Sequence, residues 1–193
     1  MDIVLVHGFM DRGHKFDPLN RALTAAGHRC FAPSLTPRDA RLGIVDLAGK
    51  LERYIESTLV AEQSFALVGF SMGCLISRYY LQELAGVERC RAFFAIAGPL
   101  QGSRMAHLYF GRGAADMRPG SHFLLQLQAG EHKLGNLPIH SYRTPYDLMI
   151  IPSISSHWPR AENHISSALA HPLMLRNRLV TQHILQTLAD LAV

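Results

Sequence analysis

The chain has 193 residues, of which 48% are hydrophobic and 18% charged, and its formal net charge at neutral pH is +4. This length is enough for one domain with a sizeable core and too short for two ordinary domains. Lys and Arg residues are scattered and form no basic stripe with interleaved aromatic residues, so we expect no nucleic-acid partner. We predict one soluble domain over residues 1–193, and the sequence leaves its oligomeric state open.

The cysteines and the start of the chain indicate the compartment. Cys30, Cys74 and Cys90 cannot all pair within the chain and show no metal-ligand spacing, so we expect reduced, buried residues. The N-terminal residues already have the pattern of a strand, without a basic region and cleavage site, and no apolar stretch reaches membrane-spanning length. These features predict a cytoplasmic protein with no integral membrane association.

The first predicted strand ends in a loop that is a candidate for ligand binding. Residues 3–6 are a continuous aliphatic run, typical of a strand buried on both faces of a parallel sheet. The loop His7-Gly8-Phe9-Met10 follows, at the end of the strand where open α/β sheets bind their ligands. We expect the Phe9 N–H to donate to an oxyanion, Met10 to contact substrate and His7 to make structural hydrogen bonds.

The next elements follow from hydrophobic spacing and turn residues. The pattern predicts a short helix over residues 19–26, a strand at 28–32, a surface loop at 34–43 and an amphipathic helix over 44–59.

An abrupt change from strand to helix follows at Ser71. Residues 65–70 are apolar like a buried strand, and apolar residues after Ser71 recur at helical spacing. Gly69 and Gly73 flank the serine, where a tight turn leaves no room for a Cβ. This is the G-x-S-x-G nucleophile elbow, in which the N–H after the serine, here that of Met72, is the second oxyanion donor.

The alternation of strands and helices then continues before it breaks. Residues 92–97 form another buried strand, so the pattern predicts right-handed crossovers and a parallel sheet covered by helices on both faces. Residues 104–136 interrupt this pattern, with apolar clusters at 105–110 and 123–127 that fit short helices. This insertion is equally compatible with a packing excursion and with a lid over the strand ends.

The sheet resumes after the insertion and supplies a carboxylate and an imidazole. Residues 139–142 form a strand followed by Asp147, and a weaker strand over 163–170 is followed by His171. An amphipathic helix over residues 173–191 closes the domain. A serine hydroxyl needs a base and an orienting carboxylate, and the order Ser71, Asp147, His171 is that of the elbow architecture.

Other residues compete for these two roles. His157 lies in a loop near the predicted site, and His164 begins the last predicted strand instead of leaving it. Asp116 lies inside the insertion, and Asp190 lies at the far end of the final helix. Topology favours Asp147 and His171, with His157 as the main alternative base.

With these motifs in hand, the chain resembles the α/β-hydrolase superfamily, and within it the small lipases and esterases called lipase class 2. The segments that support the resemblance are Val6-His7-Gly8-Phe9, Gly69-Phe70-Ser71-Met72-Gly73 and Ser77-Arg78-Tyr79-Tyr80-Leu81. The resemblance implies an α/β fold with three αβα layers, a mostly parallel six-stranded sheet and a short lid-like insertion.

The sequence departs from that family at a few positions. Gly98 and Leu100 stand where many lipases have a serine and a histidine, and Cys74 stands where a third elbow glycine is common.

These observations predict a serine hydrolase that cleaves carboxylic esters of hydrophobic acyl groups, small molecules or lipids, through an acyl-enzyme. We expect Met10, Leu100 and Trp158 to contact substrate, Phe70 to belong mainly to the core, and no metal or organic cofactor to be required. Thioester hydrolysis or acyl transfer by the same residues is an alternative. A non-catalytic binding module is a third possibility.

Overall fold

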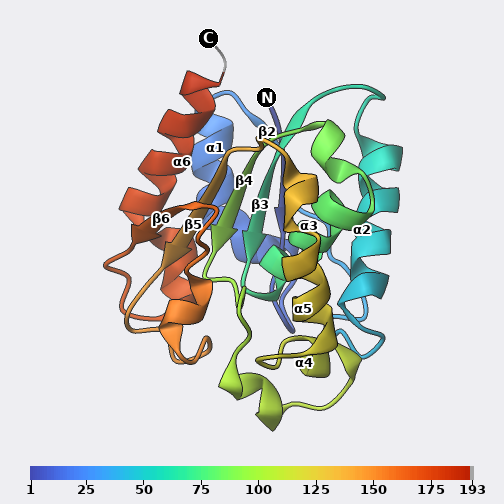
Figure 1. Cartoon of the computed structure of the whole chain (residues 1–193). Helices are drawn as coiled ribbons and strands as arrows, with labels where there is room; N and C mark the ends of the chain where they lie inside the picture. The colour runs from blue at the N-terminus through green and yellow to red at the C-terminus, as the bar shows by residue number, and fades with distance from the viewer. Residues whose placement is uncertain (192–193) are drawn as a thin grey trace.

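A single parallel sheet forms the centre of the molecule. The computed structural model describes residues 1–191, and within them six strands pair in parallel in the order β2-β1-β3-β4-β5-β6 (Figure 1). The strands are β1 Asp2–Val6, β2 Arg29–Phe31, β3 Phe65–Phe70, β4 Cys90–Ile96, β5 Ile139–Arg143 and β6 Glu162–Ile165. The predicted six-stranded sheet is confirmed, and all of its pairings are parallel.

Helices cover both faces of this sheet. Helices α1 (Asp17–Ala25) and α6 (Arg178–Asp190) lie on one side, and α2 (Ile44–Thr58), α3 (Met72–Glu83) and α5 (His122–Ala129) lie on the other (Figure 1). The predicted three-layer αβα architecture is therefore confirmed. Within residues 1–191, no helix combines the length and apolar character that crossing a membrane requires.

Each strand in the middle of the sheet feeds two separate cores. In β1, Ile3 and Leu5 pack with α1 and α6, whereas Val4 and Val6 pack with α2 and α3. Side chains alternate between the two faces of a strand, so a strand covered on both sides must be apolar throughout. This explains the continuous aliphatic run from which a buried parallel strand was predicted.

The insertion over residues 104–136 contains short helices, as its apolar clusters predict. These are η3 (Arg104–Leu108), α4 (Arg112–Asp116), α5 and η4 (Glu131–Leu134). From Asp116 onward it is anchored to two helices: Asp116 accepts a 2.9 Å hydrogen bond from the Ile44 N–H at the start of α2, and the Phe123 ring stacks on Tyr79 of α3 at 5.8 Å. Its first half crosses the strand ends and leaves Phe110 94% exposed.

The last part of the chain differs in its boundaries from the sequence prediction. The strand predicted over residues 163–170 ends at Ile165, because the Ser166 hydroxyl accepts a hydrogen bond from the Ala168 N–H in a local turn that leaves the sheet. The helix predicted from residue 173 begins at Arg178, where Asn177 caps it by accepting from the Val180 N–H. Between them, η6 (His171–Arg176) contains His171.

Candidate active site

Ser71 lies at a strained turn between β3 and α3. Its backbone has φ 54° and ψ −126°, in a region that residues with a side chain rarely adopt. The turn is held because the Ser71 N–H donates to Ile96 O at 2.9 Å and Ser71 O accepts from the Cys74 N–H at 3.0 Å. A Cβ at Gly73 would lie 2.0 Å from Val6 O, so a larger residue at this position is sterically excluded. The elbow geometry therefore depends on its second glycine.

His7 fixes the loop that follows β1. Its Nε2 accepts a 2.8 Å hydrogen bond from the Leu35 N–H, so the ring is a neutral tautomer whose Nδ1–H donates to Gly8 O, also at 2.8 Å. Burial lowers the pKa of His7 below its ordinary value of 6.5, with smaller opposing contributions from these hydrogen bonds. The structural role predicted for His7 is confirmed.

The two predicted oxyanion donors lie beside Ser71. Met72 is the first residue of α3, so its N–H has no acceptor within the helix. Phe9 follows the loop glycine, and its side chain lines the same small pocket as Ser71. The helix N-terminus adds a partial positive charge at this point. Phe9 and Met72 are therefore both near Ser71, and their role as oxyanion donors stays a prediction.

Asp147 and His171 form a buried hydrogen-bonded pair. The distance from His171 Nδ1 to Asp147 Oδ2 is 2.7 Å, and the two side chains are 8% and 2% exposed. The other carboxylate oxygen, Oδ1, accepts from the N–H groups of Met149 at 2.8 Å and Ile150 at 2.9 Å. The carboxylate is held by three donors, so it orients the imidazole.

The candidate base packs against Phe70, the residue before the serine, and among the described residues no hydrogen bond joins Ser71 Oγ to His171. The Phe70 ring is 4.8 Å from the His171 ring, centroid to centroid, with the two planes inclined at 38°. Phe70 is 1% exposed, in agreement with its predicted place in the core. The end of β3 thus packs directly against the candidate base.

Ser103 is a site residue that our sequence analysis did not single out. Its hydroxyl donates to Met149 O at 2.8 Å and accepts from the Ile151 N–H at 3.0 Å. It therefore ties the loop that carries Asp147 to the start of the insertion. The segment Gly98-Pro99-Leu100-Gln101-Gly102-Ser103 resembles the stretch Ser-Pro-His-x-Gly-Thr of many lipases, and the hydroxyl residue at its last position is the signal that would have identified Ser103.

A small apolar pocket of about 40 Å³ contains Ser71. Phe9 and Tyr109 form one wall with their rings edge to face at 5.1 Å, and Met105 and Met149 contribute to the lining. Tyr109 and Met105 belong to the insertion, so residues 104–110 help to build this pocket. The lining favours an apolar group bound next to the serine.

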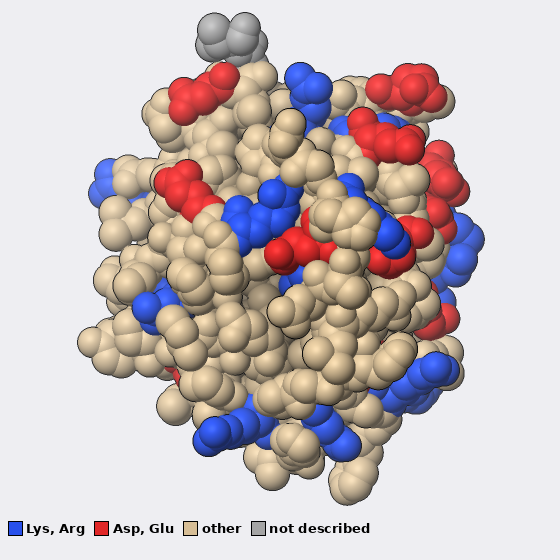
Figure 2. Space-filling view, in the orientation of Figure 1, with Lys and Arg blue, Asp and Glu red and all other residues tan. Residues whose placement is uncertain are grey.

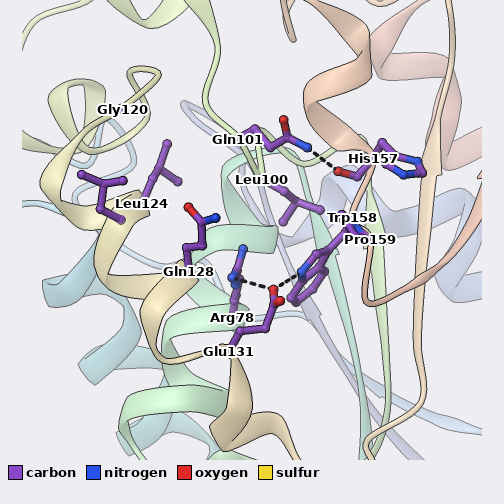
Figure 3. Close-up of a pocket in the computed structure, with 11 residues that line it drawn as sticks. Arg78, Leu100, Gln101, Gly120, Leu124, Gln128, Glu131, His157, Trp158 and Pro159 are labelled. Atoms are coloured by element: carbon purple, nitrogen blue, oxygen red, sulfur yellow. Dashed lines mark hydrogen bonds and ion pairs between the residues drawn. The ribbon is translucent and has the colours of Figure 1, made fainter.

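Met10, Leu100 and Trp158, the three predicted substrate contacts, do not lie together around Ser71. Met10 is 57% exposed, with a left-handed φ of 61°. Leu100 and Trp158 are buried and line a second pocket of about 410 Å³, and Ser71 is not among the residues that line it (Figure 3).

Trp158 is fixed within that second pocket by charged neighbours. The Arg78 guanidinium lies 4.3 Å from the centre of the Trp158 ring and 3.1 Å from Glu131 Oε1, and the indole N–H donates to the same carboxylate oxygen (Figure 3). These contacts join α3, η4 and the loop before β6. Trp158 therefore has a packing role in the described structure.

The competing acids and bases have other partners. The backbone oxygen of His157 accepts a 2.9 Å hydrogen bond from Gln101 Nε2, and the Asp116 carboxylate accepts a hydrogen bond from the first N–H of α2. Asp190 accepts from Gln186 Nε2 at 2.9 Å on α6, and His164 belongs to a separate histidine cluster on the outer part of the sheet. Of the residues weighed for the acid and base, Asp147 and His171 are the two that contact each other.

Two departures from the lipase pattern prove to be complementary. A Cβ built on Gly98 would lie 2.5 Å from Cys74 Cβ and 2.7 Å from its Sγ. The Cys74 side chain, which is fully buried, therefore occupies the space that a serine at position 98 would need. Having both residues leaves the region next to the elbow filled.

Comparison with known proteins identifies similar chains. The family model for the alpha/beta hydrolase fold matches residues 3–111. A pyrethroid hydrolase from Sphingobium wenxiniae is 30% identical over 105 residues, which are 50% of this chain and 38% of that protein.

Several solved structures have the same fold. Lipase B of Aspergillus fumigatus superposes with a TM-score of 0.81 at 14% identity, over 97% of this chain and 52% of that one. The mature lipase BlEst2 of Bacillus licheniformis gives a TM-score of 0.72 at 13% identity, over 97% and 91% of the two chains. A methylesterase from Arabidopsis gives 0.68 at 13% identity, over 98% and 99%. The matched part of this chain thus spans well under two thirds of the pyrethroid hydrolase and about half of the Aspergillus lipase.

Proposed function

Because the chain belongs to the alpha/beta hydrolase fold family, we propose that it is a serine hydrolase that cleaves carboxylic esters of apolar acyl groups. Ser71 is the nucleophile, His171 the general base and Asp147 the residue that orients the base. The observation that carries the proposal is the buried 2.7 Å hydrogen bond between His171 and Asp147, next to the strained turn at Ser71.

The proposed reaction begins with proton transfer from Ser71 to His171. The Ser71 Oγ attacks the ester carbonyl while the imidazole accepts its proton, and Asp147 stabilises the imidazolium that forms. The N–H groups of Phe9 and Met72 stabilise the tetrahedral oxyanion, each contributing on the order of 3 kcal/mol. His171 then protonates the leaving alcohol, and an acyl-enzyme remains on Ser71. A water molecule deprotonated by His171 releases the acid.

The pocket at Ser71 supports a small apolar acyl group. Its volume of about 40 Å³ and its lining by Phe9, Tyr109 and Met105 leave little room for a long chain inside the protein. Leu148 and Phe110, the sequence neighbours of the lining residues Met149 and Tyr109, are 76% and 94% exposed. At the bottom of the face drawn in Figure 2, where Figure 1 places α4, the charged side chains that can be seen are Lys and Arg. The small volume and apolar lining of the pocket favour an ester with a short, uncharged acyl group.

The test is hydrolysis of p-nitrophenyl esters of increasing acyl length by the wild type and by Ser71→Ala. We expect wild-type activity that falls as the acyl chain lengthens, and a loss of about 10⁶-fold in the variant. Labelling with a fluorophosphonate, followed by mass spectrometry, is expected to modify Ser71. An unlabelled Ser71 in folded protein would show a binding module, and faster turnover of acyl-CoA than of oxygen esters would assign a thioesterase instead.

A further inference from the structure

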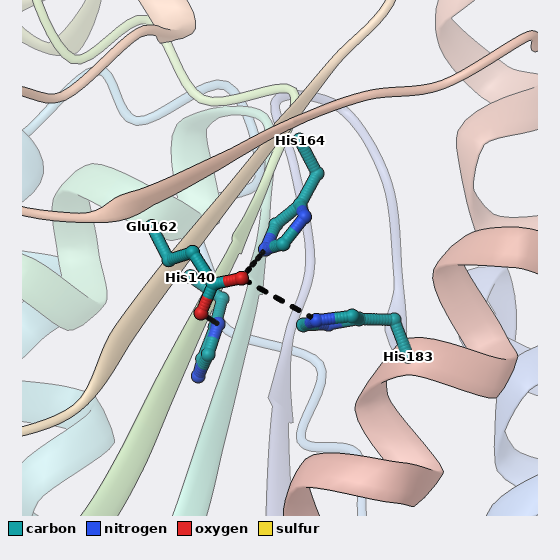
Figure 4. Close-up of side chains that lie close together, drawn as sticks. All are labelled: His140, Glu162, His164 and His183. Atoms are coloured by element: carbon teal, nitrogen blue, oxygen red, sulfur yellow. Dashed lines mark ion pairs between the residues drawn. The ribbon is translucent and has the colours of Figure 1, made fainter.

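Four metal-binding side chains converge on the outer part of the sheet, away from the elbow. His140 comes from β5, Glu162 and His164 from β6, and His183 from α6 (Figure 4). One nitrogen or oxygen atom of each residue lies within 4.8 Å of those of all the others. Figure 4 shows the three imidazoles arranged around the carboxylate of Glu162. None of these residues takes part in the hydrolytic mechanism.

The distances in the cluster approach those of a coordination shell. Glu162 Oε2 lies 3.3 Å from His140 Nδ1, and Oε1 lies 3.5 Å from His164 Nε2 and 3.9 Å from His183 Nε2. Donor atoms at about 2.0–2.2 Å from a tetrahedral zinc ion are about 3.3–3.6 Å from one another. The widest separations in the cluster, up to 4.8 Å, would have to shorten by about 1 Å to complete such a shell.

Two nitrogens of the cluster have no hydrogen-bond partner. His140 Nδ1 and His164 Nε2 are buried, and neither makes a hydrogen bond within residues 1–191. Buried polar atoms in folded proteins nearly always have a partner, so an orphaned pair calls for an explanation. Both atoms face Glu162 within 3.5 Å, and a cation between them and the carboxylate would satisfy all three groups.

The third histidine is already oriented as a metal ligand. Its Nδ1 is hydrogen bonded to the Tyr142 hydroxyl at 2.7 Å, which leaves Nε2 directed at Glu162. A hydrogen bond at the second ring nitrogen is the usual way in which proteins orient a ligating histidine.

We propose that His140, Glu162, His164 and His183 form a structural site for a divalent transition metal, with zinc as the ion that the donor set fits best. Three imidazoles and one carboxylate suit zinc, whereas calcium and magnesium prefer shells of oxygen atoms. Four protein ligands complete a tetrahedron and leave no position for a reacting water, so the site is structural.

The proposed ligands come from three elements, which a bound metal would connect. The metal joins strands β5 and β6 to helix α6, and the segment between β6 and α6 contains His171. Glu162 has a side chain that is 63% exposed, and His164 and His183 line a surface pocket of about 470 Å³, so an ion has a path from solvent. Zinc at this site fixes both ends of the segment that carries the candidate base.

The test is zinc titration of the purified, chelator-treated protein by calorimetry, together with the visible spectrum of the cobalt-substituted form. We expect one ion per chain with a Kd below about 1 µM, and a tetrahedral cobalt spectrum. Zinc at about 100 times its Kd is expected to raise the Tm by about 5 to 10 °C. The partly exposed ligands allow milder variants: Glu162→Gln and His183→Gln are each expected to weaken binding by about 100-fold or more.

Two control variants separate this site from other histidines. His132→Ala removes an exposed histidine, and His171→Ala removes the candidate base, and neither is expected to alter zinc affinity or the cobalt spectrum. Circular dichroism before titration verifies that every variant is folded. The proposal is overturned by the absence of stoichiometric zinc binding in the wild type, by binding that survives Glu162→Gln combined with His183→Gln, or by binding that disappears in His171→Ala.

Discussion

The histidine paired with Asp147 and the histidines at the sheet edge differ in the partners that hold them. His171 donates to a carboxylate that two backbone N–H groups also hold, and that carboxylate is 2% exposed. His140 and His164 face a carboxylate that is 63% exposed, and each has an orphaned buried nitrogen. A carboxylate held by several donors orients a base, whereas an exposed one beside orphaned nitrogens suits an added cation. The state of the carboxylate therefore distinguishes the two sites.

Replacing the Asp147 carboxylate with a neutral amide is expected to have the largest effect on activity. Asp147→Asn is expected to lower kcat for ester hydrolysis by about 10⁴-fold, because the amide no longer stabilises the imidazolium or selects its tautomer. Steady-state kinetics on a short-chain p-nitrophenyl ester measure the loss. Asp190→Asn, on the exposed end of α6, is the matched control and should be within about twofold of wild type. Equal activity of the two variants would remove Asp147 from the mechanism.

Loosening the loop that holds the carboxylate gives a smaller effect. Ser103→Ala deprives Ile151 N–H and Met149 O of their partner, so Asp147 is held less firmly. We expect kcat to fall by about tenfold, with KM little changed and a stability loss of about 1–3 kcal/mol.

A conservative replacement tests whether Ser103 acts through its hydroxyl. Ser103→Thr retains the group and should restore most of the rate lost in Ser103→Ala. Denaturant unfolding, measured on the same preparations, separates a local positioning effect from partial unfolding. Full activity of Ser103→Ala would show that the loop holds Asp147 without this residue.

His7 differs from the histidines of both sites because each of its ring nitrogens makes a hydrogen bond to the backbone. Because burial lowers its pKa below 6.5, the neutral ring stabilises the fold above that pH, and this contribution is lost as the pH falls through the lowered value. We expect His7→Gln to unfold at a lower urea concentration than wild type at pH 7.5, and the difference to shrink at pH 5. A gap of the same size at both pH values would contradict this assignment.

The features that could be predicted from the sequence are those that follow a local motif or a fixed order of residues along the chain. The elbow needs a serine midway between two glycines four residues apart, and the acid and base follow from the order of strand ends. Asp147 and His171 were therefore predictable, and the structure brings them into contact. The parallel sheet was predictable for the same reason, since buried strands and amphipathic helices alternate.

Contacts that depend on strand register lie beyond the sequence. The pairing of β5 with β6 sets His140 opposite Glu162 and Tyr142 opposite His164, and a shift of one residue would separate them. The spacing of His140, Glu162, His164 and His183 matches no metal-binding motif, so the cluster becomes visible only when the sheet and α6 are assembled. The same limit applies to Ser103 and to the fixed position of Trp158.

The crowding between Gly98 and Cys74 constrains the order in which these two positions can change during evolution. Loss of the thiol side chain first leaves a void, which a folded protein tolerates at some cost in stability. If position 98 gains a side chain first, its Cβ lies 2.5 Å from the Cys74 Cβ, and a folded protein does not tolerate such a contact. A lineage passing between this pair and the glycine and serine of many lipases therefore crosses through the form with glycine at both positions.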